Sequence, residues 1–261
     1  MKLSFAEYPP NSEKYEYPYQ VFATIDPENE IDVALDQGFL PTRFHKKIFM
    51  LGRSGRVNLA IFALSSENRR ILRKTQQFHV EVLDLDHFDY TNEVQLNCKT
   101  WLNSRIGQKV ISAQGVKKAF KLLNNNIVFV WYKGDEVVGY VVGIGTDNVF
   151  YYNWAFYNPV YVRENLGVRM MLEAVQYAQT SKMSYIYLGT VYTKGSLYKT
   201  QYKGFEFFDG IRWNKNLKDL KFLIRRSNVA ESYYWQDEQW RVQNGFERVK
   251  DIIESIATSS A

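Results

Sequence analysis

The stretch from residue 126 to residue 189 constrains the fold of this chain more than any other. Three runs rich in β-branched and aromatic residues lie within NIVFVWYKGDEVVGYVVGIGTDNVFYYNWAFYNP, and the short turns between them predict three antiparallel strands. The next segment, ENLGVRMMLEAVQYAQTSK, predicts an amphipathic helix. Its apolar side is formed by Val168, Met171, Leu172, Val175 and Ala178. MSYIYLG then predicts a further strand, so the order indicates an α+β fold in which helices flank a mixed central sheet.

The first 110 residues carry shorter patterns. Alternating or continuous apolar residues predict strands at 20–25 and within FHKKIFMLG, RVNLAIFAL and HVEVLDLD. Helices are expected in ENEIDVALDQGF and in SSENRRILRKTQQF, which a serine at 65 or 66 can cap. SAQGVKKAFKLLNNN, just after residue 110, predicts a further helix. TNEVQLNCKTWLNSRIG predicts another helix, with Leu96, Trp101 and Leu102 facing inward.

The chain has no long linker or low-complexity tract that would separate independent domains. We therefore expect two halves in close contact, residues 1–110 and residues 111–261. The basic helix near 66–77 belongs to the first half, and a helical tail ends the second.

Composition excludes several kinds of site. The single cysteine, Cys98, allows neither an internal disulfide framework nor a cysteine-based metal site. The histidines, His45, His79 and His87, show no metal-ligand spacing, so no metal is expected. No apolar run is long enough to span a membrane, so we expect a cytoplasmic protein with no membrane partner. The net charge of +5 allows a basic patch but does not require a nucleic acid.

A first basic cluster lies on the helix expected after residue 65. Arg69, Arg70, Arg73 and Lys74 share one side of that helix. They form either a solvated face or a contact with the phosphates of a nucleic acid.

A second basic segment, TVYTKGSLYKTQYKGF, is also rich in tyrosine. It follows a strand that ends at Gly189, which is itself a candidate substrate contact. Its key residues are Tyr198 and Tyr202, with Lys194, Lys199 and Lys203. Within a local helix the rings can stack on the bases of a single-stranded 3′ end while the lysines contact phosphates. The alternative is that the tyrosines pack on the sheet and the lysines only aid solubility.

The element order predicted from 126 to 189 resembles the core of the acyltransferase fold shared by N-acetyltransferases and aminoacyl-tRNA–protein transferases. We therefore expect an acyl-CoA N-acyltransferase (GNAT)-like fold, doubled over the two halves. A CoA enzyme of this fold needs a glycine-rich turn whose N–H groups hold the pyrophosphate at the start of the long helix. ENLGVR instead brings Glu164 and Arg169 to that turn, so acetyl-CoA is the less favoured donor.

Consecutive aromatic residues in YYNWAFYNP cannot all face one side of a strand. In this fold the strand carries a bulge that turns it away from its parallel neighbour and opens a cleft, where backbone N–H groups can bind an acyl carbonyl. Trp154, Phe156 and Tyr157 are candidate pocket walls, although a strand buried on both sides would show the same pattern. Asn158 is either a substrate contact or a turn former before Pro159.

The segments NWAFYNP, ENLGVRMMLEAVQYAQTSK and YIYLGTVYTKGSLYKTQYKGFEFFDGIRW resemble, in this order, the C-terminal half of the arginyl-tRNA–protein transferases. FALSSENRRILRKTQQF and TNEVQLNCKTWLNSRIG resemble upstream segments of the same family. The family's N-terminal cysteine cluster is absent here, and Asn158 replaces the aspartate of its Phe-Tyr-Asp-Pro turn. The resemblance implies the transferase fold and an aminoacyl-tRNA donor, and it leaves the amino acid open.

These observations predict an enzyme that takes an amino acid, arginine among the candidates, from a charged tRNA. The acceptor would be the α-amine of a protein, a peptide or a small molecule, with no cofactor beyond the tRNA co-substrate. No Ser-His-Asp or Cys-His arrangement is evident, and a general base could be Tyr187 or Glu173. An acyl-CoA-dependent N-acetyltransferase and a non-catalytic descendant that binds RNA or protein are the alternatives.

Overall fold

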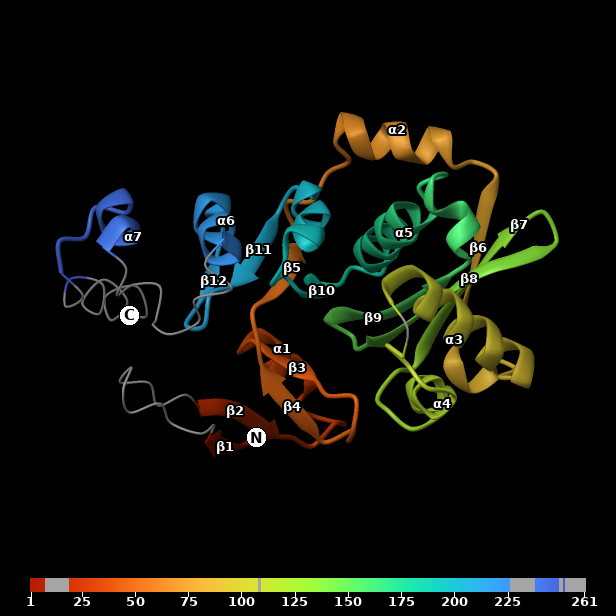
Figure 1. Ribbon diagram of the computed structural model, residues 1–261, viewed down its shortest axis with the longest axis horizontal. Helices are drawn as coiled ribbons and strands as arrows, with labels where there is room; N and C mark the ends of the chain where they lie inside the picture. The colour runs from red at the N-terminus through yellow and green to blue at the C-terminus, as the bar shows by residue number, and fades with distance from the viewer. Residues whose placement is uncertain (8–18, 108, 226–237, 249–250, 252–261) are drawn as a thin grey trace.

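The computed structural model describes residues 1–7, 19–107, 109–225, 238–248 and 251. An eight-stranded mixed sheet lies at its centre, in the order β12-β11-β5-β10-β9-β8-β7-β6 (Figure 1). The strands are β5 (Ser54–Asn58), β6 (Phe78–Asp84), β7 (Ile127–Lys133), β8 (Glu136–Gly145), β9 (Val149–Tyr157), β10 (Tyr185–Thr190), β11 (Phe205–Phe208) and β12 (Trp213–Asn214). β9 and β10 pair in parallel, and the other described neighbours in this sheet are antiparallel.

The C-terminal core follows the order predicted from the sequence. β7, β8 and β9 form two hairpins, and helix α5 (Leu166–Thr180) carries the chain across to β10, as a parallel pair requires. The α+β class, the mixed sheet and the GNAT-like core are therefore confirmed. β5 and β6, from the first 110 residues, lie in the same sheet as β7 to β12. The division at residue 110 and the doubled architecture stay predictions.

Helices cover both faces of this sheet (Figure 1). α5 and α2 (Ser66–Lys74) pack on one face, over a core that includes Phe129, Trp131 and Phe150. α3 (Asn92–Ile106) and α4 (Ala113–Lys121) cover the other face around Val128 and Phe156. α2 begins as predicted, because the Ser65 side chain accepts a hydrogen bond from the backbone N–H of Asn68.

A smaller sheet in the order β1-β2-β4-β3 stands against the end of β8 to β10. It contains β1 (Lys2–Glu7), β2 (Tyr19–Thr24), β3 (Phe39–Pro41) and β4 (Ile48–Leu51), and helix α1 (Ile31–Asp36) packs with it. At the β12 end of the large sheet, α6 (Leu217–Arg225) and α7 (Glu238–Gln243) cover β11. Three 3-10 helices, η1 (Leu85–His87), η2 (Pro159–Val162) and η3 (Lys194–Gln201), complete the described elements. The remainder of the predicted helical tail lies outside the described residues.

Three local expectations were wrong. β5 ends at Asn58, whose side chain accepts a hydrogen bond from the backbone N–H of Ala60, so the apolar residues 59–64 form a connection to α2. β4 begins only at Ile48, after a turn. Leu96 is 61% exposed, because the inward side of α3 is the one that carries Val94, Cys98, Trp101 and Leu102.

Candidate functional site

A cleft opens where the parallel strands β9 and β10 separate. Their pairing runs from Tyr185 opposite Val149 to Tyr187 opposite Tyr151, and no further pair joins them. β9 also contains a bulge, since Val142 of β8 faces Trp154 while its neighbour Gly143 faces Tyr152. The predicted bulge and the separation of the two strands are therefore confirmed.

The bulge at Asn153 changes the face on which the aromatic side chains of β9 lie. Phe150 and Tyr152 pack in the core on the α5 side of the sheet. Trp154 and Phe156, which a regular strand would place on that same side, pack in the core under α3 and α4. One inserted residue thus explains how a run of consecutive aromatic residues lines a cleft and fills two cores.

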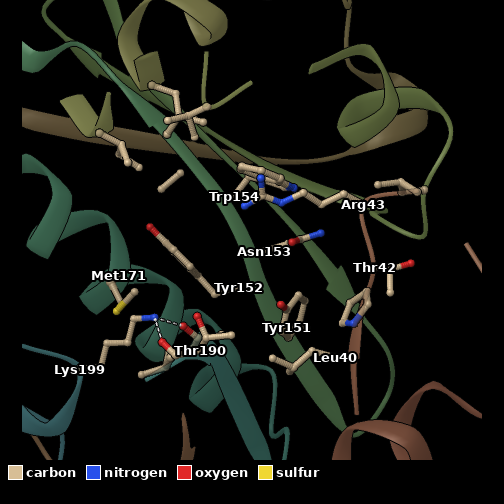
Figure 2. Close-up of a pocket in the computed structure, with 18 of the residues that line it drawn as sticks. Leu40, Thr42, Arg43, Tyr151, Tyr152, Asn153, Trp154, Met171, Thr190 and Lys199 are labelled. Carbon is tan, nitrogen blue, oxygen red and sulfur yellow. Dashed lines mark hydrogen bonds between the residues drawn. The ribbon is translucent and has the colours of Figure 1, made fainter. Parts of the chain in front are cut away.

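The cleft has a volume of about 600 Å³, within the range of small-molecule sites. Its walls come from β3 and the loop that follows it, from α3, β9, α5 and β10, and from η3. Apolar and aromatic side chains dominate the interior, among them Leu102, Met171, Leu188, Tyr151 and Tyr152. Figure 2 shows the β9 residues Tyr151 to Trp154 along the middle of the site.

Three cations reach this cleft, and the rest of its described lining is uncharged. The Arg43 guanidinium lies 4.4 Å from the ring centroid of Trp154 (Figure 2). The Arg105 guanidinium lies 3.8 Å from the ring centroid of Tyr157, and its Nη2 donates to the carbonyl oxygen of Ala155 at 3.0 Å. Arg105 Nη1 is buried without a hydrogen-bond partner among the described residues, so it can still bind an oxygen ligand.

Lys199 is the third cation. Its Nζ donates to the carbonyl oxygens of Leu188 at 2.7 Å and Thr190 at 3.0 Å, across the end of β10 (Figure 2). Burial lowers the pKa of the Lys199 amine from 10.5 to about 8. Gly189, between the two carbonyls, has a φ of +75°, a conformation that glycine adopts without strain. The amine is therefore held at the mouth of the cleft with a pKa close to physiological pH.

The start of α5 differs from a pyrophosphate site. The Glu164 carboxylate accepts hydrogen bonds from Lys133 Nζ and Gln77 Nε2 at 3.1 Å each, and these bonds lower the pKa of Glu164. A Cβ built on Gly167 would lie 2.4 Å from the Tyr157 hydroxyl, so this ring covers the backbone at the helix start. A negative charge and a tyrosine thus occupy the place where a phosphate would have to approach.

The predicted site residues fall into three groups. Trp154, Gly189, Tyr198 and Lys199 line the cleft, and Tyr157 lies beside it under Arg105. Elsewhere in the fold lie Phe156, Tyr202, Tyr187 and Glu173, together with Asn158. The exposed Lys194, at the start of η3, and Lys203, two residues after its end, lie outside the cleft lining.

The predicted residues that lie away from the cleft have contacts typical of structural roles. Phe156 and Tyr202 are buried in the cores, and Asn158 accepts a hydrogen bond from the backbone N–H of Val160, as a turn former does. Glu173 pairs with Arg169 on α5 at 2.8 Å. Burial raises the pKa of Tyr187 well above its usual value, so this hydroxyl stays protonated at neutral pH.

The basic side of α2 does not line the cleft. Arg70 pairs with Glu67, and Arg69 Nη1 donates to the carbonyl oxygen of Leu64 at 2.6 Å. Arg73 and Lys74 are exposed.

Arg43, Arg105 and Met171 also line the cleft without having been predicted as site residues. Arg43 stands in a segment with no motif, and Arg105 lies near the end of a segment that resembles the family but carries no basic cluster. Among the described residues there is no group of three His, Cys, Asp or Glu side chains that could hold a metal, and no helix long and apolar enough to cross a membrane.

Comparisons with known proteins identify a family for the greater part of the chain. The family model described as "Arginine-tRNA-protein transferase, C terminus" matches residues 76–209. A search of curated proteins finds no match.

Several solved structures show a limited similarity. The C-terminal domain of a putative lysylphosphatidylglycerol synthetase from Agrobacterium fabrum is 14% identical with a TM-score of 0.41, over 64% of this chain and 52% of that one. The chain thus spans about half of that protein's length. L-PGS from Bacillus licheniformis is 12% identical with a TM-score of 0.39, over 80% and 72% of the two chains. A GNAT-family acetyltransferase from Streptococcus pneumoniae is 14% identical with a TM-score of 0.29, over 42% and 72%.

Proposed function

The chain belongs to the family of the arginine-tRNA-protein transferase C terminus, and from this membership we propose that it is an aminoacyl-tRNA-dependent transferase. In the proposed reaction the α-amine of a protein or peptide attacks the ester carbonyl that joins the amino acid to the tRNA. An amide bond forms, the bond to the ribose oxygen breaks, and the tRNA leaves with a free 3′ hydroxyl. The observation that carries the proposal is the cationic, aromatic cleft between β9 and β10.

The residues around the cleft suit the 3′ end of a charged tRNA. The half-exposed Tyr198 offers a ring face on which a single-stranded base can stack, and Trp154, which stacks on Phe156 beneath Arg43, forms an aromatic wall of the cleft. Arg43 and Arg105 lie beside these rings and can neutralise the adjoining phosphates. We assign these four residues to donor binding. A charged tRNA as donor, a protein or peptide N-terminus as acceptor and a cytoplasmic location are parts of the same proposal.

Catalysis of this reaction needs little beyond positioning and charge stabilisation, because the tRNA ester is already activated. Asn153, the bulge residue of β9, has no partner in the register with β8. We propose that its backbone N–H faces the carbonyl oxygen of the ester and stabilises the oxyanion that forms there.

We assign the proton transfer to Lys199 in place of Tyr187 or Glu173, since neither of those residues lines the cleft. The neutral amine of Lys199 takes a proton from the attacking nitrogen. The resulting ammonium gives that proton to the ribose oxygen as it leaves. A pKa near 8 suits a group that must accept and return a proton near neutral pH.

The alternative of an acyl-CoA enzyme finds less support. Glu164 is held as a carboxylate at the start of α5, and Tyr157 covers Gly167, so a pyrophosphate would meet a negative charge and a blocked backbone. The arginine that the family name indicates is one candidate for the transferred amino acid.

The test is to incubate the full chain with a pool of labelled aminoacyl-tRNAs and a library of peptides that differ at their N-terminal residue. We expect label to pass to at least one peptide, and to none of the same peptides after N-acetylation. Binding of tRNA without transfer from any donor would overturn the proposal. A clear thermal shift with CoA and none with tRNA would favour the acyl-CoA alternative instead.

A further inference from the structure

We propose that the amino acid transferred in this cleft has an uncharged, apolar side chain, such as leucine, methionine or phenylalanine. This inference rests on the proposed function and adds its substrate class. It starts from the charges in the cleft. Arg43, Arg105 and Lys199 line the cavity, and none of the described residues that line it is an aspartate or a glutamate. A donor guanidinium or ammonium entering this space would meet the permanent charges of two arginines, and that of Lys199 when its amine is protonated, with no carboxylate to pair with.

Three backbone carbonyls around the cleft already accept hydrogen bonds from these cations. The carbonyl oxygens of Leu188 and Thr190 accept from Lys199, and that of Ala155 accepts from Arg105. A guanidinium has five N–H donors, which need acceptors once water is removed. With no carboxylate in the described lining, a buried guanidinium could pair only with neutral oxygens, such as those of Thr42 and Asn153, which do not compensate its charge.

The interior offers apolar contacts instead. Leu102, Met171 and Leu188 come from α3, α5 and β10, and each side chain is buried at the wall of the cleft. These residues would face a leucine, methionine or phenylalanine side chain and remove it from water. The volume of about 600 Å³ lies in the range that holds a ligand of the size of an aminoacyl nucleoside.

The experiment compares donors that share one tRNA and differ in the amino acid attached to it. The full chain receives tRNA charged chemically with leucine, methionine, phenylalanine, glutamate, arginine or citrulline, and initial rates are measured with one acceptor peptide. Citrulline has nearly the shape of arginine without its charge, so this pair isolates the electrostatic contribution. No substitution in the protein is needed, and folding therefore does not affect the comparison.

We expect the apolar donors to react roughly 100-fold faster than the arginine donor, with citrulline between them, because an unpaired buried charge is far less favourable than a neutral polar group. An arginine donor as fast as citrulline, or any charged donor faster than the apolar ones, would overturn this inference and leave the proposed function standing. No transfer from any of the six donors or from a wider pool would instead contradict the proposed function itself.

Discussion

The amine of Lys199 is bound to two backbone carbonyls at the mouth of the cleft, where burial lowers its pKa to about 8. The transfer rate should therefore depend on the protonation state of this amine. Below pH 8 the amine is protonated and cannot accept a proton, and above pH 8 it is neutral. We therefore predict that the transfer rate rises about tenfold per pH unit below 8 and levels off above it. The measurement should use an aminooxy-terminated acceptor peptide, whose nucleophile is neutral throughout, so that only the enzyme titrates.

The matched variants are Lys199→Arg and Lys203→Arg. Arginine keeps the positive charge but does not lose its proton near neutral pH, so Lys199→Arg should lose at least roughly 100-fold in rate. Lys203 is exposed outside the cleft lining, and Lys203→Arg should leave both the rate and the pH profile unchanged. If Lys199→Arg kept its activity, the residue would act through its charge and not through proton transfer.

Individual residues of the cleft could be predicted from the sequence only where a motif surrounded them. Tyr198 and Lys199 stand in a tyrosine-rich basic segment after a strand, and Trp154 in an aromatic run, and all three line the cavity. Arg43 reaches the cleft from the loop after β3, and Arg105 reaches it from α3. Both segments are far in the chain from β9, β10 and η3, which form the rest of the site. Their role depends on tertiary packing, which leaves no local signal.

At the scale of the elements, the β8–β9 hairpin sets the direction of the cleft wall. Gly143 stands at the bulge, and a Cβ there would lie 2.3 Å from a ring carbon of Phe150 and 2.7 Å from the carbonyl oxygen of Tyr151. We predict that Gly143→Ala lowers the free energy of unfolding by about 1–3 kcal/mol, because ring and backbone must both shift. Gly195→Ala in η3 is the control, since its nearest contact is an ordinary 3.6 Å and its cost should be near zero. Urea titrations of both variants measure the two free energies of unfolding. Equal unfolding midpoints for Gly143→Ala and Gly195→Ala would contradict the prediction that the bulge needs a glycine at 143.

The helix α2 presents a separate basic surface. Arg69 and Arg70 already have partners within the helix region, so Arg73 and Lys74 are the better probes of tRNA contact. We predict that replacing both by Glu lowers the salt dependence of tRNA affinity, with the slope of log K against log salt falling by about 2. Lys218 and Lys221, exposed on α6, provide a control pair whose replacement should leave the slope unchanged. An unchanged slope for the α2 variant would remove this helix from the binding surface.

Most elements of the C-terminal core could be predicted from the sequence because they obey one dominant period. The β7–β9 runs alternate or remain apolar throughout, and α5 keeps a continuous apolar side. β5 is different, because its five residues SGRVN have little strand pattern and pair with β10 and β11, both more than 100 residues away in the chain. Its place between β11 and β10 in the interior of the sheet is decided by long-range pairing, which a local pattern does not encode.

At the scale of the whole molecule, Arg56 of β5 joins three parts of the fold. Its Nε donates to Glu206 of β11 at 2.9 Å, and its Nη1 donates to Asp36, the last residue of α1, at 2.6 Å. The guanidinium also lies 3.9 Å from the ring centroids of both Tyr185 and Trp213. Arg56 and Glu206 are buried, whereas the Asp36 side chain is 65% exposed. The network therefore connects the small N-terminal layer, the central sheet and the β11–β12 hairpin through one charged side chain.

We predict that Arg56→Met lowers the free energy of unfolding by roughly 3 kcal/mol, because Glu206 is left buried with only Lys215, 3.5 Å away and exposed, as a partner. Asp36→Asn, which removes the exposed partner of the same arginine, should cost less than about 1 kcal/mol. Combining Arg56→Met with Glu206→Leu should recover much of the loss, since the uncompensated buried carboxylate is then gone. Denaturant unfolding of the three variants measures this directly. Equal losses for Arg56→Met and Asp36→Asn would mean that the buried pair does not hold the layers together, and that their apolar contacts alone suffice.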